Sequence, residues 1–158
     1  MDIDLNWPGL HPVQKAIDAD PSKRVMLVLG RRTGKSVYLG LRAARAMIAG
    51  ERVGLFTPLR SHGKDILTSV EDLLWPLKPK FNRSEGAIEL LNGGRLESFS
   101  LENVNAGRGK RFHLALCDEL SLGKPSDAIG GGVKATIEQA VLLSIPALHD
   151  RSFREHDQ

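Results

Sequence analysis

Three short runs of consecutive apolar residues divide the chain. They cover residues 25–29, 53–57 and 112–117, and runs of this length are typical of strands that are buried on both faces of a parallel sheet. Two segments between the runs favour helices: residues 35–49 are rich in Ala, Leu and Arg, and residues 62–75 place apolar side chains on one face. This alternation predicts an α/β fold, with the three strands parallel and the helices covering their faces.

Three further segments complete the predicted elements. Residues 10–19 indicate a short helix with a proline in its first turn, where proline is tolerated. Residues 87–91 and 95–99 are strand-like runs around Asn-Gly-Gly, and this pattern predicts a β-hairpin. The sequence Thr-Ile-Glu-Gln at 136–139 resembles a capping box, so we expect a helix from there to about residue 144.

The strongest chemical signal lies between the first predicted strand and the first long helix. Residues 30–36 are Gly-Arg-Arg-Thr-Gly-Lys-Ser, and a glycine-containing loop in this position can surround a polyphosphate with backbone N–H groups and the positive end of the helix. Lys35 can reach the β- and γ-phosphates, and the Ser36 hydroxyl can ligate Mg²⁺. The general motif has a glycine at position 29, where this chain has leucine, so the loop is a near-match and a chance strand–helix turn is the competing interpretation.

The second chemical signal is a pair of carboxylates, Asp118 and Glu119, directly after the apolar run 112–117. Ligands of parallel α/β sheets bind outside the carboxyl ends of the strands. We therefore expect Asp118 to lie near the phosphate loop and to hold Mg²⁺, and Glu119 to orient or deprotonate an attacking water. An ordinary strand end is the alternative for this motif alone. The glutamate favours an ATPase over a small-molecule kinase, which needs no base for water.

Composition adds few constraints. The 158 residues suit one domain, the formal net charge is +3, and the single cysteine, Cys117, excludes an internal disulfide and fits a small apolar core residue. No apolar run approaches the length of a membrane span, and the acidic N-terminus is unlike a signal peptide, so we expect a cytoplasmic protein and no membrane partner. The histidines lack metal-ligand spacing; they are His11, His62, His113, His149 and His156.

Basic residues offer weaker signals. Arg108, Lys110 and Arg111 lie in a polar loop and are candidates for contact with DNA phosphates or a neighbouring subunit, with a solvated loop as the alternative. Arg42 and Arg45 lie on the predicted helix 35–49, where we expect a solvated surface.

Together these motifs resemble one family, the ATPase domain of the large terminase subunit, which packages DNA into tailed-phage capsids. The loop Gly-Arg-Arg-Thr-Gly-Lys-Ser is this family's form of the motif, and the segment Leu-His-Pro-Val-Gln at 10–14 looks like its adenine-recognition segment. The predicted hairpin before the acidic strand also fits. The resemblance implies a P-loop NTPase of the ASCE type, with a parallel core sheet flanked by helices and an inserted β-hairpin.

The resemblance also implies ATP and Mg²⁺ as ligands and translocation of double-stranded DNA as the function. Glu119, Lys35 and Arg31 are the predicted catalytic residues, with Arg31 or Arg32 stabilising the γ-phosphate or simply pairing with an anion. Ser36 and Asp118 are the predicted Mg²⁺ ligands. The implied partners are DNA, the portal, the small terminase subunit and other copies of the chain, in the host cytoplasm. The predicted nucleotide-binding residues are Gln14, Gly30, Arg31, Arg32, Thr33, Gly34, Lys35 and Ser36.

Two departures from the family limit this interpretation. Residues 136–148 fit a helix better than the family's coupling strand, so we expect that strand to be absent. We see no second cluster of carboxylates, so we expect no nuclease activity and a domain, residues 1–158, that is incomplete at its C-terminal end. A nucleotide-binding but inactive remnant and another helicase-like P-loop ATPase are the alternatives.

Overall fold

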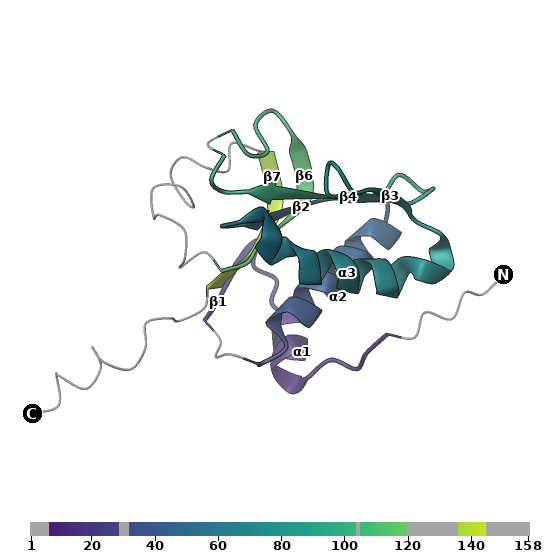
Figure 1. Ribbon diagram of the computed structural model, residues 1–158. Helices are drawn as coiled ribbons and strands as arrows, with labels where there is room; N and C mark the ends of the chain where they lie inside the picture. The colour runs from purple at the N-terminus through teal and green to yellow at the C-terminus, as the bar shows by residue number, and fades with distance from the viewer. Residues whose placement is uncertain (1–6, 29–31, 104, 120–135, 145–158) are drawn as a thin grey trace, which may run out of the picture.

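The computed structural model describes residues 7–28, 32–103, 105–119 and 136–144. They build one sheet whose strands follow the order β1-β7-β6-β2-β5-β4-β3. Figure 1 shows the sheet with helices packed along one face. The strands are β1 (Arg24–Val28), β2 (Arg52–Thr57), β3 (Lys80–Asn82), β4 (Ala87–Glu89), β5 (Arg95–Ser100), β6 (Arg111–Cys117) and β7 (Thr136–Ser144).

Five neighbouring strands of this sheet are parallel. β1 pairs with β7, β7 with β6, β6 with β2 and β2 with β5, all in the same direction. The prediction of a parallel core is therefore confirmed. The expectation that residues 25–29 are buried on both faces is wrong for Met26, which is 59% exposed; among the described residues β1 is an edge strand, with β7 beside it.

The antiparallel part of the sheet confirms the predicted hairpin. β4 pairs with β5 from Ala87 opposite Glu97 to Glu89 opposite Arg95, and Leu90 N donates to Gly94 O at 2.8 Å to close the turn. The short strand β3 then pairs with β4; the sequence pattern did not predict it, because three residues are too few to show an alternation.

The helix predicted over residues 136–144 is wrong. This segment is the strand β7, inserted in parallel between β1 and β6 with Ala140 opposite Arg24 on one side and Ala115 on the other. The expectation that a strand is absent from this position is therefore also wrong. The pairing has a physical cause: two strands flank the segment, and ladder hydrogen bonds to both outweigh a local capping signal.

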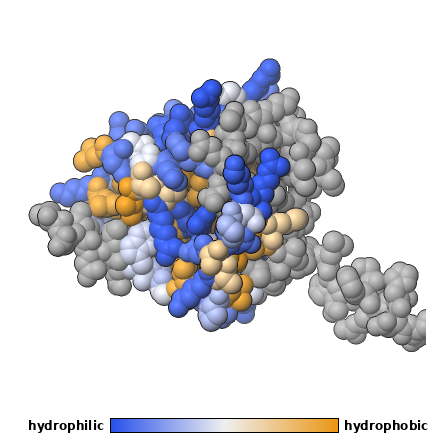
Figure 2. All heavy atoms as spheres, turned by 180° about the vertical axis from the view of Figure 1, so that it is seen from behind, coloured by the Kyte–Doolittle hydropathy of each residue, from blue (hydrophilic) through white to orange (hydrophobic). Residues whose placement is uncertain are grey.

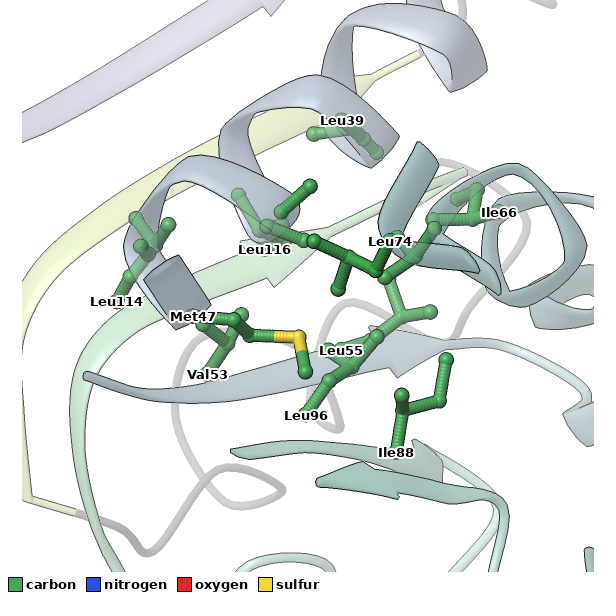
Figure 3. Packing of buried hydrophobic residues seen from close by; sticks show 14 of the residues in the cluster. Leu39, Met47, Val53, Leu55, Ile66, Leu74, Ile88, Leu96, Leu114 and Leu116 are labelled. Atoms are coloured by element: carbon green, nitrogen blue, oxygen red, sulfur yellow. The ribbon is translucent and has the colours of Figure 1, made fainter. Parts of the chain in front are cut away.

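The helices cover one face of the sheet and form the main core. Figure 3 shows Leu39 and Met47 of α2 and Ile66 and Leu74 of α3 pointing toward Leu55 and its neighbours on the strands. The side chains labelled there are at most 3% exposed. The helical segments are α1 (Pro12–Asp18), α2 (Lys35–Ile48), α3 (Lys64–Leu74) and the 3₁₀ turns η1 (Arg60–Gly63) and η2 (Trp75–Leu77).

A smaller apolar cluster lies on the other face of the sheet. The rings of Phe56, Phe99 and Phe112 pack with centroids 5.2 to 5.9 Å apart, and Cys117 belongs to the same cluster. Burial raises the pKa of the Cys117 thiol to about 12, which fits its predicted role as a small apolar residue.

The surface combines hydrophilic and hydrophobic residues. Seen from behind, hydrophilic residues are interspersed with smaller hydrophobic patches over the coloured part of the molecule (Figure 2), as is usual for protein surfaces. None of the helices in the described ranges has the length and apolar character needed to cross a membrane.

Candidate functional site

The short helix α1 contacts the phosphate loop through Gln14, which is only 9% exposed. Its Nε2 donates to Gly34 O at 3.2 Å, and its Oε1 accepts a hydrogen bond from His11 N at 2.9 Å. The second bond is half of a capping box, whose other half is the His11 side chain accepting from Val13 N. The same amide therefore caps α1 and holds it against the loop.

The loop enters α2 through a glycine that the geometry requires. Gly34 has φ +77°, a left-handed conformation that other residues adopt at a cost, and a Cβ there would lie 3.1 Å from Gln14 Nε2. Lys35 begins α2, and the glycine at the cap position makes no side-chain cap hydrogen bond. The positive dipole end of a helix favours an anion at this position. Of the predicted loop residues, Gly30 and Arg31 lie outside the described residues.

A cavity of about 440 Å³ lies between α1, the loop and the start of α2. This volume is within the range of small-molecule sites, roughly 300–1,000 Å³. One wall is largely apolar and the other carries the loop backbone and Lys35. The lining residues are Gly9, His11, Val13, Gln14, Ile17, Leu27, Arg32, Thr33, Gly34, Lys35, Val37 and Tyr38.

Asp118 lies at the carboxyl end of β6 and is 5% exposed. Its backbone N donates to Phe56 O at 3.0 Å, so the ladder between β2 and β6 fixes its position. Burial, and then the charge of Glu119, raise the pKa of the Asp118 carboxyl, while the Glu119 backbone N–H, Lys35 and His62 partly offset this. Among the described residues no basic side chain forms an ion pair with Asp118.

The topology explains how the loop and the acidic pair meet. β7 separates β1 from β6, so the two strands are not neighbours. All three are parallel, however, and their carboxyl ends lie at the same edge of the sheet. Lys35 is near enough to Asp118 for its charge to lower the pKa of the Asp118 carboxyl.

Glu119 carries a contact that the sequence analysis missed. His62 Nδ1, from η1 just after β2, lies 3.0 Å from Glu119 Oε2, although the angle does not make this an aligned hydrogen bond. Glu119 itself has φ +53°, and its N donates to Asp118 Oδ1 at 2.9 Å. Strained non-glycine residues of this kind are frequent at functional sites. A lone histidine far from Glu119 along the chain offers no motif that could have revealed this contact.

Four other basic residues contact groups within the chain. Lys110 Nζ donates to the buried Glu97 at 2.6 Å, and Arg108 donates to Asn105 at 3.3 Å. Arg42 and Arg45 both form ion pairs with Asp18, and their side chains are 22% and 43% exposed, so the expected solvated surface fits Arg45 better than Arg42. No cluster of three or more metal-ligating side chains occurs in the ranges the structure describes.

No family model matches the chain, and no curated protein matches it. Solved structures do match. The ATPase domain of the Thermus phage P74-26 large terminase superposes with a TM-score of 0.68 at 20% identity, over 86% of this chain and 64% of that domain. The large terminase of bacteriophage HK97 gives 0.64 at 14% identity, over 87% of this chain and 33% of that protein.

A third similar structure is the large terminase of a thermophilic bacteriophage in complex with ADP, with a TM-score of 0.53 at 15% identity, over 87% of this chain and 36% of that one. This chain thus spans less than two thirds of each of these structures. The likeness confirms the predicted fold: the chain shares the architecture of terminase ATPase domains, with a mostly parallel sheet.

Proposed function

We propose that this chain is the ATP-hydrolysing motor domain of a phage DNA-packaging terminase, working in the host cytoplasm. Two independent observations support the proposal. The fold is that of terminase ATPase domains, and the phosphate loop and acidic pair, singled out from the sequence alone, meet at one edge of the sheet. We take residues 1–158 as one domain.

The cavity between α1 and α2 is the proposed ATP site. The triphosphate lies over the N-terminus of α2, where Lys35, Thr33 and the N–H groups of the first turn face an anion. The base lies toward α1, beside Gln14 and its apolar neighbours in the cavity wall. Arg31 or Arg32 stabilises the γ-phosphate, as arginines commonly do in phosphoryl transfer.

The proposed Mg²⁺ ligands are the Ser36 hydroxyl and the Asp118 carboxylate, directly or through water. The donor set fits the ion, since Mg²⁺ prefers oxygen ligands and keeps several waters. Asp118 supports this assignment because it is a buried carboxylate without an ion-pair partner among the described residues, and burial raises its pKa. Bound Mg²⁺ would neutralise phosphate charge.

Glu119 is the proposed base for hydrolysis. Its carboxylate accepts a proton from the water whose oxygen attacks the γ-phosphorus, while the bond from that phosphorus to the β-phosphate oxygen breaks and ADP leaves. The side chain is 28% exposed, so water can reach it. Its neighbour His62, 3.0 Å away, limits the positions that the carboxylate can take.

The observation that carries the proposal is the convergence of Lys35, Asp118 and Glu119 at the carboxyl edge of the sheet. The test is phosphate release with and without Mg²⁺, together with ATP binding, for the wild type and Glu119→Gln. We expect Glu119→Gln to bind ATP normally and to lose about 10²–10⁴-fold in turnover. The exposed Lys23, changed to alanine, is the matched surface control. A wild type that binds ATP without Mg²⁺-dependent turnover would instead identify an inactive remnant.

Coupling to DNA requires its own test. We expect linear double-stranded DNA to stimulate phosphate release in the wild type, and the stimulation to fall as salt rises, because contacts with DNA phosphates release counterions. Arg111→Ala is expected to weaken the stimulation. If DNA leaves ATP turnover unchanged, the proposed ATPase activity stands and the proposed motor function is contradicted. Other copies of the chain, a portal and a small terminase subunit are the partners proposed for the assembled motor.

A further inference from the structure

A cluster of polar side chains joins α1 to α2 at the end away from Gln14. Asp18, the last residue of α1, accepts hydrogen bonds from Tyr38 Oη at 2.8 Å and Arg42 Nη1 at 3.4 Å, and it forms an ion pair with Arg45. The three donors are spaced by four and three positions along α2, which places them on one face of that helix. The Asp18 carboxylate therefore contacts three side chains on the same face of α2.

α1 depends on such contacts for its position. It has only seven residues, and an isolated helix of that length does not persist in water. Gln14 is its only buried residue, and Val13 is 45% exposed, so little apolar packing holds the helix. Its polar contacts with the loop and α2 are the Gln14 bond to Gly34 at one end and Asp18 at the other.

The contacts of Asp18 with Tyr38 and Arg42 are partly buried. Its side chain is 19% exposed, and Tyr38 as a residue is 2% exposed. Burial, and then the hydrogen bond to Asp18, raise the pKa of the Tyr38 hydroxyl above its usual range, so the hydroxyl stays protonated and donates. Arg45 also lies over the Trp7 ring, 5.8 Å from its centroid, which ties the segment before α1 to the same cluster.

Tyr38 belongs to both the cluster and the cavity. It lines the cavity opposite α1, whereas the phosphate-facing part is built by the loop and Lys35. We propose that Asp18, Tyr38, Arg42 and Arg45 are positioning residues that hold the base-side wall of the cavity, and so set the affinity for the nucleoside part of the ligand but not for its phosphates. This inference rests on the proposed ATP site.

The test compares two ligands that share their phosphates. Dissociation constants are measured for Mg²⁺-ATP and for Mg²⁺-tripolyphosphate, which has no base or sugar. In Tyr38→Phe and Asp18→Asn we expect ATP to bind about tenfold more weakly, as for the loss of one well-formed hydrogen bond, while tripolyphosphate binding stays the same. Asp18→Glu, which restores a carboxylate, is expected to recover part of the ATP affinity.

Two further variants keep the test decisive. Glu71→Gln removes the α3 carboxylate that pairs with the exposed Arg83 and is the matched control, expected to change neither constant. Arg45→Gln alters a side chain that is 43% exposed, so we expect this variant to fold even if Tyr38→Phe does not. We expect it to weaken ATP binding less than Tyr38→Phe does and to leave tripolyphosphate binding unchanged.

The outcomes separate this inference from the proposed function. If the wild type binds neither ligand, the ATP site fails and the inference fails with it. If the wild type binds both ligands, the proposed ATP site stands, and the variants then test the positioning role. Equal weakening of ATP and tripolyphosphate, or unchanged ATP binding in Tyr38→Phe, Asp18→Asn and Arg45→Gln, would overturn the positioning role.

Discussion

Asp118 and Glu97 are two buried carboxylates with opposite electrostatic surroundings. Asp118 is 5% exposed and Glu97 is 6% exposed. Burial raises the pKa of Asp118, and the charge of Glu119 adds to this effect. Burial alone would also raise the pKa of Glu97, but Lys110 and Arg95 outweigh it, so the pKa of Glu97 lies below its usual value. Replacing each carboxylate by its amide should therefore change stability in opposite directions.

For Asp118→Asn we expect the folded state to gain stability. The amide keeps the shape and removes a charge that is poorly solvated, and stabilising substitutions of this kind contribute about 1 kcal/mol, or a rise in Tm of roughly 2–4 °C for a chain of this size. The sign with pH follows from the raised pKa. The cost of the charge is fully present above the folded pKa and fades as the pH falls toward the ordinary value of 3.8.

For Glu97→Gln we expect the folded state to lose stability. The carboxylate lies 2.6 Å from Lys110 and 3.2 Å from Arg95, and breaking a buried pair costs several kcal/mol. Because the side chains of Lys110 and Arg95 are 40% and 29% exposed, we reduce this cost to about 1–2 kcal/mol, or roughly 2–8 °C in Tm. The lowered pKa means that this contribution is present above pH 4.5 and is lost as the pH falls through the folded pKa.

The assay is thermal unfolding of the wild type and both variants in EDTA, repeated from neutral to acidic pH. A second series adds Mg²⁺-ATP, which stabilises whichever protein binds it. In that series we expect Mg²⁺-ATP to raise the Tm of the wild type more than the Tm of Asp118→Asn. A lower Tm for Asp118→Asn than for the wild type in EDTA, or changes of the same sign in the two variants, would refute the electrostatic argument.

Two other substitutions test separate parts of the account. In Gly94→Ala, the new Cβ would lie 1.9 Å from Met47 O, so the turn must move and we expect a loss of about 1–3 kcal/mol in chemical denaturation; an unchanged midpoint would contradict this packing. In His62→Gln, we expect ATP turnover to fall about tenfold with ATP affinity unchanged, because positioning of Glu119 is affected and binding is not. Turnover equal to the wild type would show that the 3.0 Å contact has no role.

Strong local patterns predicted much of the fold. The apolar runs, the amphipathic helices and the Asn-Gly-Gly turn each reflect an interaction between residues close in sequence, and the strands β2 and β6 and the helices α2 and α3 lie where these patterns indicate. β7 shows the limit. The sequence Thr-Ile-Glu-Gln followed by Ala and Leu satisfies a helix locally, but hydrogen bonds to β1 and β6 depend on strands that lie far away along the chain.

The candidate site divides in the same way. Lys35, Asp118 and Glu119 were predicted from two motifs, and their meeting follows from the parallel direction of three strands. The contacts of His62 with Glu119 and of Asp18 with α2 carry no motif. They arise when η1 and α1 pack on other elements, and only the packed structure brings these side chains together.

The central claim is that the cavity at the start of α2 binds ATP through Lys35. Its most direct test is an equilibrium titration of the wild type and Lys35→Ala with Mg²⁺-ATP, with Lys23→Ala as the control. The account predicts saturable binding of one ATP by the wild type and by Lys23→Ala, and affinity at least about tenfold weaker for Lys35→Ala, as expected when a charge-assisted hydrogen bond is lost. No binding by the wild type, or equal binding by Lys35→Ala, would contradict it.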